Sequence, residues 1–270
     1  MMPEVQKRKE TGQEIILQAE QWSAIVAPLL PVITAWGIIF FASTQHQIIW
    51  LNHDFLLQRS HLPWFMALII FLVCWQVMIL AMMLPSALPL LFLIGDRART
   101  YSQSWRHQGL FIVGYASIWT AFALLAFLAD MGIHLLVARW WWLYLHSWVI
   151  GSMTLVCAGL FQLSPFKQRC LRRCRFPFAA YLSSINQEKR GLHRQGIRYG
   201  AYCLGSCWAL MLVQFGLGMS SLVWMALGTG IVMGEKALAV RYRFSEGVGA
   251  IFLLLAFLWA VLPSGLLSRI

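Results

Sequence analysis

Seven apolar runs of 18 to 31 residues follow one another along this chain of 270 residues. A run of about 20 apolar residues is what a helix needs to cross a bilayer, where no water is present to satisfy the backbone. We therefore predict an all-α, polytopic transmembrane helix bundle of about seven spans. Two of the runs, the fourth and the fifth, are short and carry polar residues, so six spans is the alternative. The runs are 24–43, 64–94, 109–129, 147–164, 200–217, 219–239 and 247–265.

The composition agrees with a chain that lies mostly in lipid. Hydrophobic residues make up 60% of the sequence and charged residues only 11%. A soluble domain usually carries about a quarter charged residues, so a soluble enzyme domain, a coiled coil and a disordered chain are all excluded. The six cysteines are too few for a disulfide framework in a chain of this length.

The basic residues predict the orientation of the spans. The net charge is +11, yet 17 of the 21 Lys and Arg residues fall in segments that an alternating topology places on one side. Cytoplasmic loops carry such an excess, so we expect the N-terminus inside and the C-terminus outside, without nucleic acid as a partner. The expected organisation is a cytoplasmic tail 1–23, a transmembrane domain 24–265 with a basic cytoplasmic loop 165–199, and a short tail 266–270.

Nine of the basic residues lie in the loop 165–199. Clusters of this kind next to a membrane span attract anionic lipid, and they can equally dock a partner protein. We predict that role for Lys167, Arg169, Arg172, Arg173 and Arg175.

Two cysteine pairs share the same spacing. Cys203 and Cys207 are four residues apart, so both thiols lie on one helix face, and Met211 extends that face by a turn. Cys170 and Cys174 repeat the spacing among arginines, whose charge would lower the pKa of a thiol.

A third group of residues lies on one stripe of the second apolar run. Met78 and Met82 are followed by Pro85 and Pro89. Pro85 cannot donate to the Ala81 carbonyl, so we expect the helix to break or kink there and to leave that carbonyl free. Broken helices are tolerated in lipid only beside protein or a cavity. The two prolines are therefore candidate kink and gating positions.

The side chains in these spans that could bind a ligand are mostly soft sulfur groups of Cys and Met. Carboxylates are scarce in the apolar runs, and serine-triad, P-loop, dinucleotide and zinc-protease signatures are absent, so we do not expect an enzyme. Thiolates and thioethers together favour Cu(I), with Zn as the second choice. The candidate metal ligands are Cys203, Cys207, Met78, Met82, Met211, Cys170 and Cys174.

Four motifs in order resemble those of one bacterial family of integral membrane proteins of unknown function, described as predicted metal-binding. The resemblance runs from about Trp64 to Arg241 and implies membrane location and metal binding, without a reaction. Tyr199 and Ser206 stand where that family tends to have His and Cys, which shifts the expected ligands toward methionine and the Cys203/Cys207 pair. The motifs are AMMxP at 81–85, QLxPxKxxCLxxCRxP at 162–177, YCLGxCWALM at 202–211 and Glu235-Lys236.

Three functions remain open from the sequence. The first is an inner-membrane protein that binds a soft metal ion, most readily Cu(I), for transport, delivery or homeostasis, with the lipid bilayer and a membrane or metal-delivery protein as partners. The second is a non-catalytic membrane subunit or assembly factor, in which the Cys, Met and Pro motifs are structural and the basic loop docks a partner. The third is membrane thiol redox activity, which the absence of a Cys-x2-Cys motif disfavours.

Overall fold

The protein is described from a computed structural model over residues 25–45, 63–96, 101–142, 148–175, 189–216, 221–237 and 243–261. Its regular structure within these ranges is helical throughout, so the all-α prediction is confirmed there. The predicted tails 1–23 and 266–270 and the part 176–188 of the basic loop lie outside the described residues. The elements are a first helix Ile25–Thr44, α2 Trp64–Met82, η3 Leu84–Ala87, α3 Leu88–Asp96, α4 Tyr101–Arg139, α6 Trp148–Leu163, α7 Pro165–Arg175, α9 Lys189–Gly216, α10 Leu222–Ala237 and α11 Arg243–Val261.

Each of the seven predicted runs contains a helix, but not every helix has the length and composition of a span. Four are long and apolar enough to cross a membrane within the described ranges, namely Ile25–Thr44, Trp64–Met82, Ser104–Arg139 and Phe244–Val261. The pair α6 and α7 makes a fifth if it forms one span, although the two helices are bent by 64°. The other two runs contain α9, whose first half is basic, and α10, which has only 16 residues. The seven crossings and their orientation therefore stay predictions.

The outward faces of the long helices are apolar. Ile33, Leu125 and Phe257 are each about two-thirds exposed, and they belong to three different helices. Soluble proteins rarely present such wide apolar surfaces to water. This surface fits helices that face lipid.

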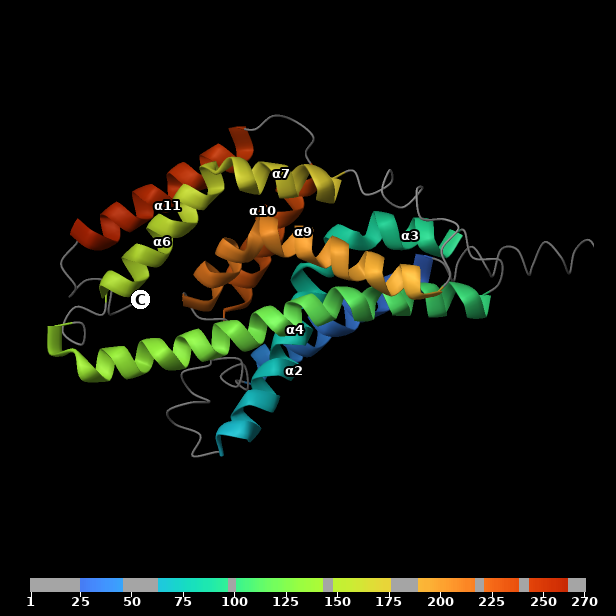
Figure 1. The fold of residues 1–270 in the computed structure, drawn as a ribbon, viewed down its shortest axis with the longest axis horizontal. Helices are drawn as coiled ribbons and strands as arrows, with labels where there is room; N and C mark the ends of the chain where they lie inside the picture. The colour runs from blue at the N-terminus through green and yellow to red at the C-terminus, as the bar shows by residue number, and fades with distance from the viewer. Residues whose placement is uncertain are drawn as a thin grey trace, which may run out of the picture.

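α4 and α9 run side by side in the same direction and form the closest helix contact of the described part (Figure 1). Two glycines make the approach possible. A Cβ atom added at Gly114 would lie 2.2 Å from the His193 carbonyl oxygen, and one added at Gly196 would lie 2.2 Å from the Phe111 carbonyl oxygen. Small residues let helix backbones approach closely in membranes. This contact brings the first half of α4 against the cysteine-bearing turn of α9.

α6 and α11 form a second close pair, which lies beside α7 at one edge of the bundle (Figure 1). The Ser152 hydroxyl of α6 donates to the Ala256 carbonyl oxygen of α11 at 3.2 Å. The end of α6 leads through the bend into α7, which packs against α9. The α6–α11 pair thus carries α7 to the face of the cysteine-bearing helix.

The break that Pro85 predicts is present. α2 ends at Met82, the 3-10 helix η3 contains Pro85, and α3 begins at Leu88 with Pro89 as its second residue. The Ala81 carbonyl, which lacks a donor from Pro85, accepts a hydrogen bond from the indole Nε1 of Trp36 at 2.9 Å. The first helix therefore stabilises the broken segment, in agreement with the rule that such breaks need protein beside them. A gating role for the two prolines stays a prediction.

Candidate metal centre

Three sulfur atoms from two distant parts of the chain meet in the core, between α9 and the break after α2. Cys203 and Cys207 lie one turn apart on α9 and are 0% and 1% exposed, so both thiols face the interior as their spacing predicts. The Cys207 Sγ lies 3.8 Å from the Sδ of Met83, and it donates to the Cys203 carbonyl oxygen at 2.8 Å. Met83, Cys203 and Cys207 are called the sulfur cluster below.

Polar groups border this cluster on the Cys203 side. The Lys236 ammonium of α10 donates to the Cys203 Sγ at 3.0 Å and to the Ser86 hydroxyl at 2.8 Å. The Tyr115 hydroxyl of α4 lies 3.1 Å from the same sulfur. Tyr199 donates to the Ser86 carbonyl oxygen at 3.1 Å. The sulfur atom of Cys203 is thus held by groups from α4 and α10, while η3 is tied to α9 and α10.

Sequence reasoning missed Met83, Tyr115 and Lys236 as members of this site. Met83 is one residue off the stripe of Met78 and Met82, and it lies directly before the break after α2. Its place in the AMMxP motif, next to the break that Pro85 predicts, was the available signal. Tyr115 had no signal in the sequence, because only the packing of α4 on α9 brings it to Cys203.

The methionines predicted as ligands occupy the packed core. Met78, Met82 and Met211 are all fully buried. The Met82 methyl lies 2.9 Å from the place that a Cβ atom on Gly228 of α10 would take. Among the described residues, the thioether in contact with the thiol of Cys207 is that of Met83. The structure therefore gives Met82 a packing contact with α10, and a ligand role for these three methionines stays a prediction.

Cys170 and Cys174 lie on the inner face of α7, against α9. The Cys170 Sγ is 2.8 Å from the position of a Cβ on Gly205, so the glycine leaves room for this thiol. Cys174 lies within interaction range of Cys203 and Ser206. In α7, which the sequence places in a cytoplasmic loop, burial raises the pKa of both thiols. Arg173 lowers the pKa of Cys170 as expected, but the effect of burial is larger.

Lys167 is not available to lipid or to a partner. It is 0% exposed, and its ammonium lies 2.7 Å from a carboxylate oxygen of Glu235, which is itself buried. The same oxygen accepts hydrogen bonds from the Gln162 amide at 3.2 Å and the Ser245 hydroxyl at 3.4 Å. The network ties α6, α7, α10 and α11 together. The docking prediction is thus corrected for Lys167, because a carboxylate far along the chain draws its charge inward.

The four arginines of α7 divide between two roles. Arg175 donates through Nε to the Glu235 carbonyl oxygen at 2.8 Å, and Arg173 donates to the Tyr202 hydroxyl. Arg169 and Arg172 are exposed. Two arginines therefore fasten α7 to α9 and α10, while two face outward as a docking surface requires.

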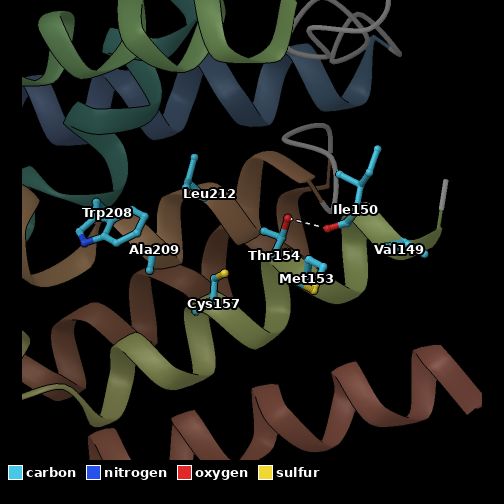
Figure 2. Close-up of a pocket in the computed structure, with 9 residues that line it drawn as sticks. Val149, Ile150, Met153, Thr154, Cys157, Trp208, Ala209 and Leu212 are labelled. Carbon is cyan, nitrogen blue, oxygen red and sulfur yellow. Dashed lines mark hydrogen bonds between the residues drawn. The ribbon is translucent and has the colours of Figure 1, made fainter. Parts of the chain in front are cut away.

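A separate apolar groove of about 450 Å³ lies between α6 and α9. Figure 2 shows Met153 and Cys157 of α6 beside Trp208 of α9, with the Thr154 hydroxyl bonded to the Ile150 carbonyl oxygen. Cys157 is exposed. The thiol of Cys157 thus lies in the groove rather than among the residues of the sulfur cluster, which makes it a control for experiments on the cluster.

Within the described ranges, no group of three or more His, Cys, Asp or Glu side chains is placed to hold a metal ion. The sulfur cluster has a different composition, two thiols and one thioether, which suits Cu(I) and suits Zn less well.

Comparison with protein families gives an independent indication of the metal. The family model of PpoB2, described as a copper chaperone, matches residues 72–259. The chain belongs to this copper chaperone family. The matched region begins before Met83 and ends after Lys236, so it contains the sulfur cluster, α7 and the residues that border the cluster. Comparison with curated proteins and with solved structures gave no match.

Membership confirms the expected relation to a metal-related family and gives the chain a copper-related function. The prediction of copper over other soft metals is thereby supported. The oxidation state of the ion, the ligands and the direction of any movement are matters for the proposal that follows.

Proposed function

We propose that this protein spans the bacterial inner membrane, binds Cu(I) as cargo at the sulfur cluster and hands it to a protein partner. The observation that carries the proposal is the contact of 3.8 Å between Cys207 Sγ and Met83 Sδ, beside the buried thiol of Cys203. Two sulfurs that share one ion at about 2.3 Å each lie about 3.8 Å apart at a tetrahedral angle. The copper chaperone family and the soft donor set support the same ion.

The α7 cysteines extend the site toward the edge of the bundle. Cys170 and Cys174 are 8% and 4% exposed, more than the two thiols of α9. The ion would enter or leave through this pair. It would pass from the α7 thiols to the α9 thiols, and the exposed fraction of the cysteines falls along that path. Handover between sulfur ligands needs no enzyme chemistry, so the proposal makes the chain a binding protein and not a catalyst.

The membrane location rests on the helices. Several are long and apolar enough to span a bilayer, and α4 and α9 run parallel, as two spans separated by one other crossing must. The exposed Arg169 and Arg172 of α7 would face anionic lipid or the partner on the cytoplasmic side.

Metal analysis of full-length protein purified without chelator tests the proposal. We expect about one Cu(I) per chain in the wild type and none in the double variant Cys203→Ser/Cys207→Ser, since hydroxyls are poor ligands for Cu(I). The matched control is Cys74→Ser/Cys157→Ser. It also removes two thiols, but Cys74 is a half-buried residue of α2 and Cys157 lines the apolar groove, so the cluster keeps its three sulfurs. Equal copper content in all three proteins contradicts the assignment of the site. A wild type without copper contradicts the function.

A non-catalytic membrane subunit or assembly factor is the second candidate. The packing of Met82 against α10 favours it, because that sulfur acts as core filler. In that case a partner captured by the wild type would also be captured by Cys203→Ser/Cys207→Ser, but not by the charge reversal Arg169→Glu/Arg172→Glu. Loss of capture in the cysteine variant would instead support copper-dependent handover.

A further inference from the structure

Lys236 places a charged side chain at the sulfur cluster. Its ammonium is neither one of the proposed sulfur ligands nor an apolar group that packs the helices together. It reaches from α10 to within 3.0 Å of Cys203 Sγ and is held at 2.8 Å from the Ser86 hydroxyl. Ser86 is fixed in turn, because its hydroxyl donates to the Met83 carbonyl oxygen at 2.6 Å. The ammonium is therefore tied both to a thiol of the cluster and to the residue that carries the thioether.

The carboxylate nearest in sequence does not neutralise this charge. Glu235 precedes Lys236 on α10, and its side chain is engaged by Lys167, Gln162 and Ser245. Among the described residues, the polar contacts of the Lys236 ammonium are the Cys203 thiol and the Ser86 hydroxyl. A positive charge thus stands at the edge of a sulfur site whose third donor, the thioether of Met83, is neutral.

A fixed cation at this place acts differently on ions of different charge. The repulsion between the ammonium and a bound ion at a given distance is twice as large for a divalent ion as for a monovalent one. Buried surroundings strengthen this difference, since they screen charge less than water does. Zn(II) and Cu(I) both accept thiolate ligands, so the donor atoms alone discriminate between them only in part.

We propose that the Lys236 ammonium makes the sulfur cluster selective for a monovalent soft ion over a divalent one. The proposal rests on the proposed function, because it takes Met83, Cys203 and Cys207 as the ligands of Cu(I). Lys236 is a positioning and selectivity residue, and it is not itself a ligand. The Cys203 sulfur and the Ser86 hydroxyl accept its hydrogen bonds and hold it in place, so its charge stays at the cluster when the ion enters.

The test measures Cu(I) and Zn(II) affinities of the full-length protein in detergent, by competition with a chromophoric chelator for each ion. The wild type is compared with Lys236→Met, Lys236→Gln and Lys236→Arg. We expect the ratio of Zn(II) to Cu(I) affinity to rise about tenfold or more in the Met and Gln variants and to stay near the wild-type value in the Arg variant. A structural defect would lower both affinities together and leave the ratio unchanged.

The matched control is Arg194→Met. Arg194 is exposed on α9 and lies about 13 Å along the helix axis from Cys203. The substitution therefore removes the same charge at a place away from the cluster. A ratio that is the same in wild type, Lys236→Met and Lys236→Gln overturns the selectivity proposal while the proposed function stands. A wild type that binds no Cu(I) overturns both.

Discussion

Two lysines, one on α7 and one on α10, meet very different partners. Lys167 of α7 is buried against the carboxylate of Glu235, and that carboxylate also receives an amide and a hydroxyl. Lys236, the residue after Glu235, instead directs its ammonium to the Cys203 thiol and the Ser86 hydroxyl. The first arrangement cancels opposite charges and fastens four helices. The second leaves a cation beside sulfur, where its charge repels a bound metal ion.

Two neighbouring residues of α10 therefore have different roles: Glu235 holds helices together, and Lys236 acts on the bound ion. A buried ion pair adds little net stability but is costly to break, because one charge then remains without its partner. A cation beside a thiol contributes less to the fold, yet it sets which ions the thiol can accept. Changes on the Glu235 side should therefore affect folding, and changes on the Lys236 side should affect copper.

The largest effect is expected for Glu235→Gln. The change leaves the Lys167 ammonium buried without a carboxylate, which typically costs about 3–5 kcal/mol. The folded yield and the thermal midpoint in detergent should both fall sharply. The double variant Lys167→Met/Glu235→Leu replaces the pair with apolar groups and should recover most of the loss. A Glu235→Gln protein as stable as the wild type would remove the distinction between the two lysines.

The next effect concerns the close backbone contact between α4 and α9, which lies beside the sulfur cluster. Gly196→Ala places a Cβ atom 2.2 Å from the Phe111 carbonyl oxygen, so α4 and α9 must move apart, at a cost of about 1–3 kcal/mol. Tyr115 would then leave Cys203, and Cu(I) affinity should fall, whereas the Lys167–Glu235 pair lies elsewhere. Gly109→Ala on α4 is the control, because a Cβ there meets nothing within 4 Å. Chelator competition and thermal melts measure both outcomes, and equal behaviour of the two variants would contradict the account.

A smaller and sharper effect concerns the thioethers. Met83→Leu keeps the volume of the side chain, so stability should change by less than about 1.5 kcal/mol. Cu(I) affinity should nevertheless fall about tenfold, or about 1.4 kcal/mol, because a sulfur ligand is lost. Met78→Leu should leave the affinity unchanged. A loss of affinity in Met78→Leu but not in Met83→Leu would return the site to the methionine stripe that the sequence suggested.

The smallest effect is expected at the outer face of α7. Arg172 is exposed, and substitutions of this kind usually change stability by less than about 0.5 kcal/mol. Arg172→Ala should therefore bind copper and melt like the wild type, while Arg175→Ala, which loses its bond to the Glu235 carbonyl oxygen, should melt lower. The same melting point in both variants would show that Arg175 does not fasten α7.

Local chemistry explains which features the sequence predicts. The break at Pro85 follows from a missing donor, and the shared face of Cys203 and Cys207 follows from their spacing of four. Helices appear at all seven apolar runs because their length and composition are local properties as well.

Contacts between distant segments explain what the sequence does not predict. The sequence predicts that Lys167 is an exposed cation. In the structure it is buried against Glu235, which lies on a helix far along the chain. Met83 enters the site only because α9 is packed beside the end of α2, where Cys207 meets its sulfur. Neither position carries a periodic signal, since both depend on which helices adjoin.

X-ray absorption at the copper edge of the Cu(I)-loaded protein tests the central claim most directly. The account predicts a first shell of sulfur alone, with three sulfurs in the wild type and two in Met83→Leu, and no bound copper in Cys203→Ser/Cys207→Ser. The same spectrum should be seen for the control variant Cys74→Ser/Cys157→Ser. A first shell containing nitrogen or oxygen, or a sulfur number that Met83→Leu leaves unchanged, would contradict the assignment of Met83, Cys203 and Cys207 as the copper ligands.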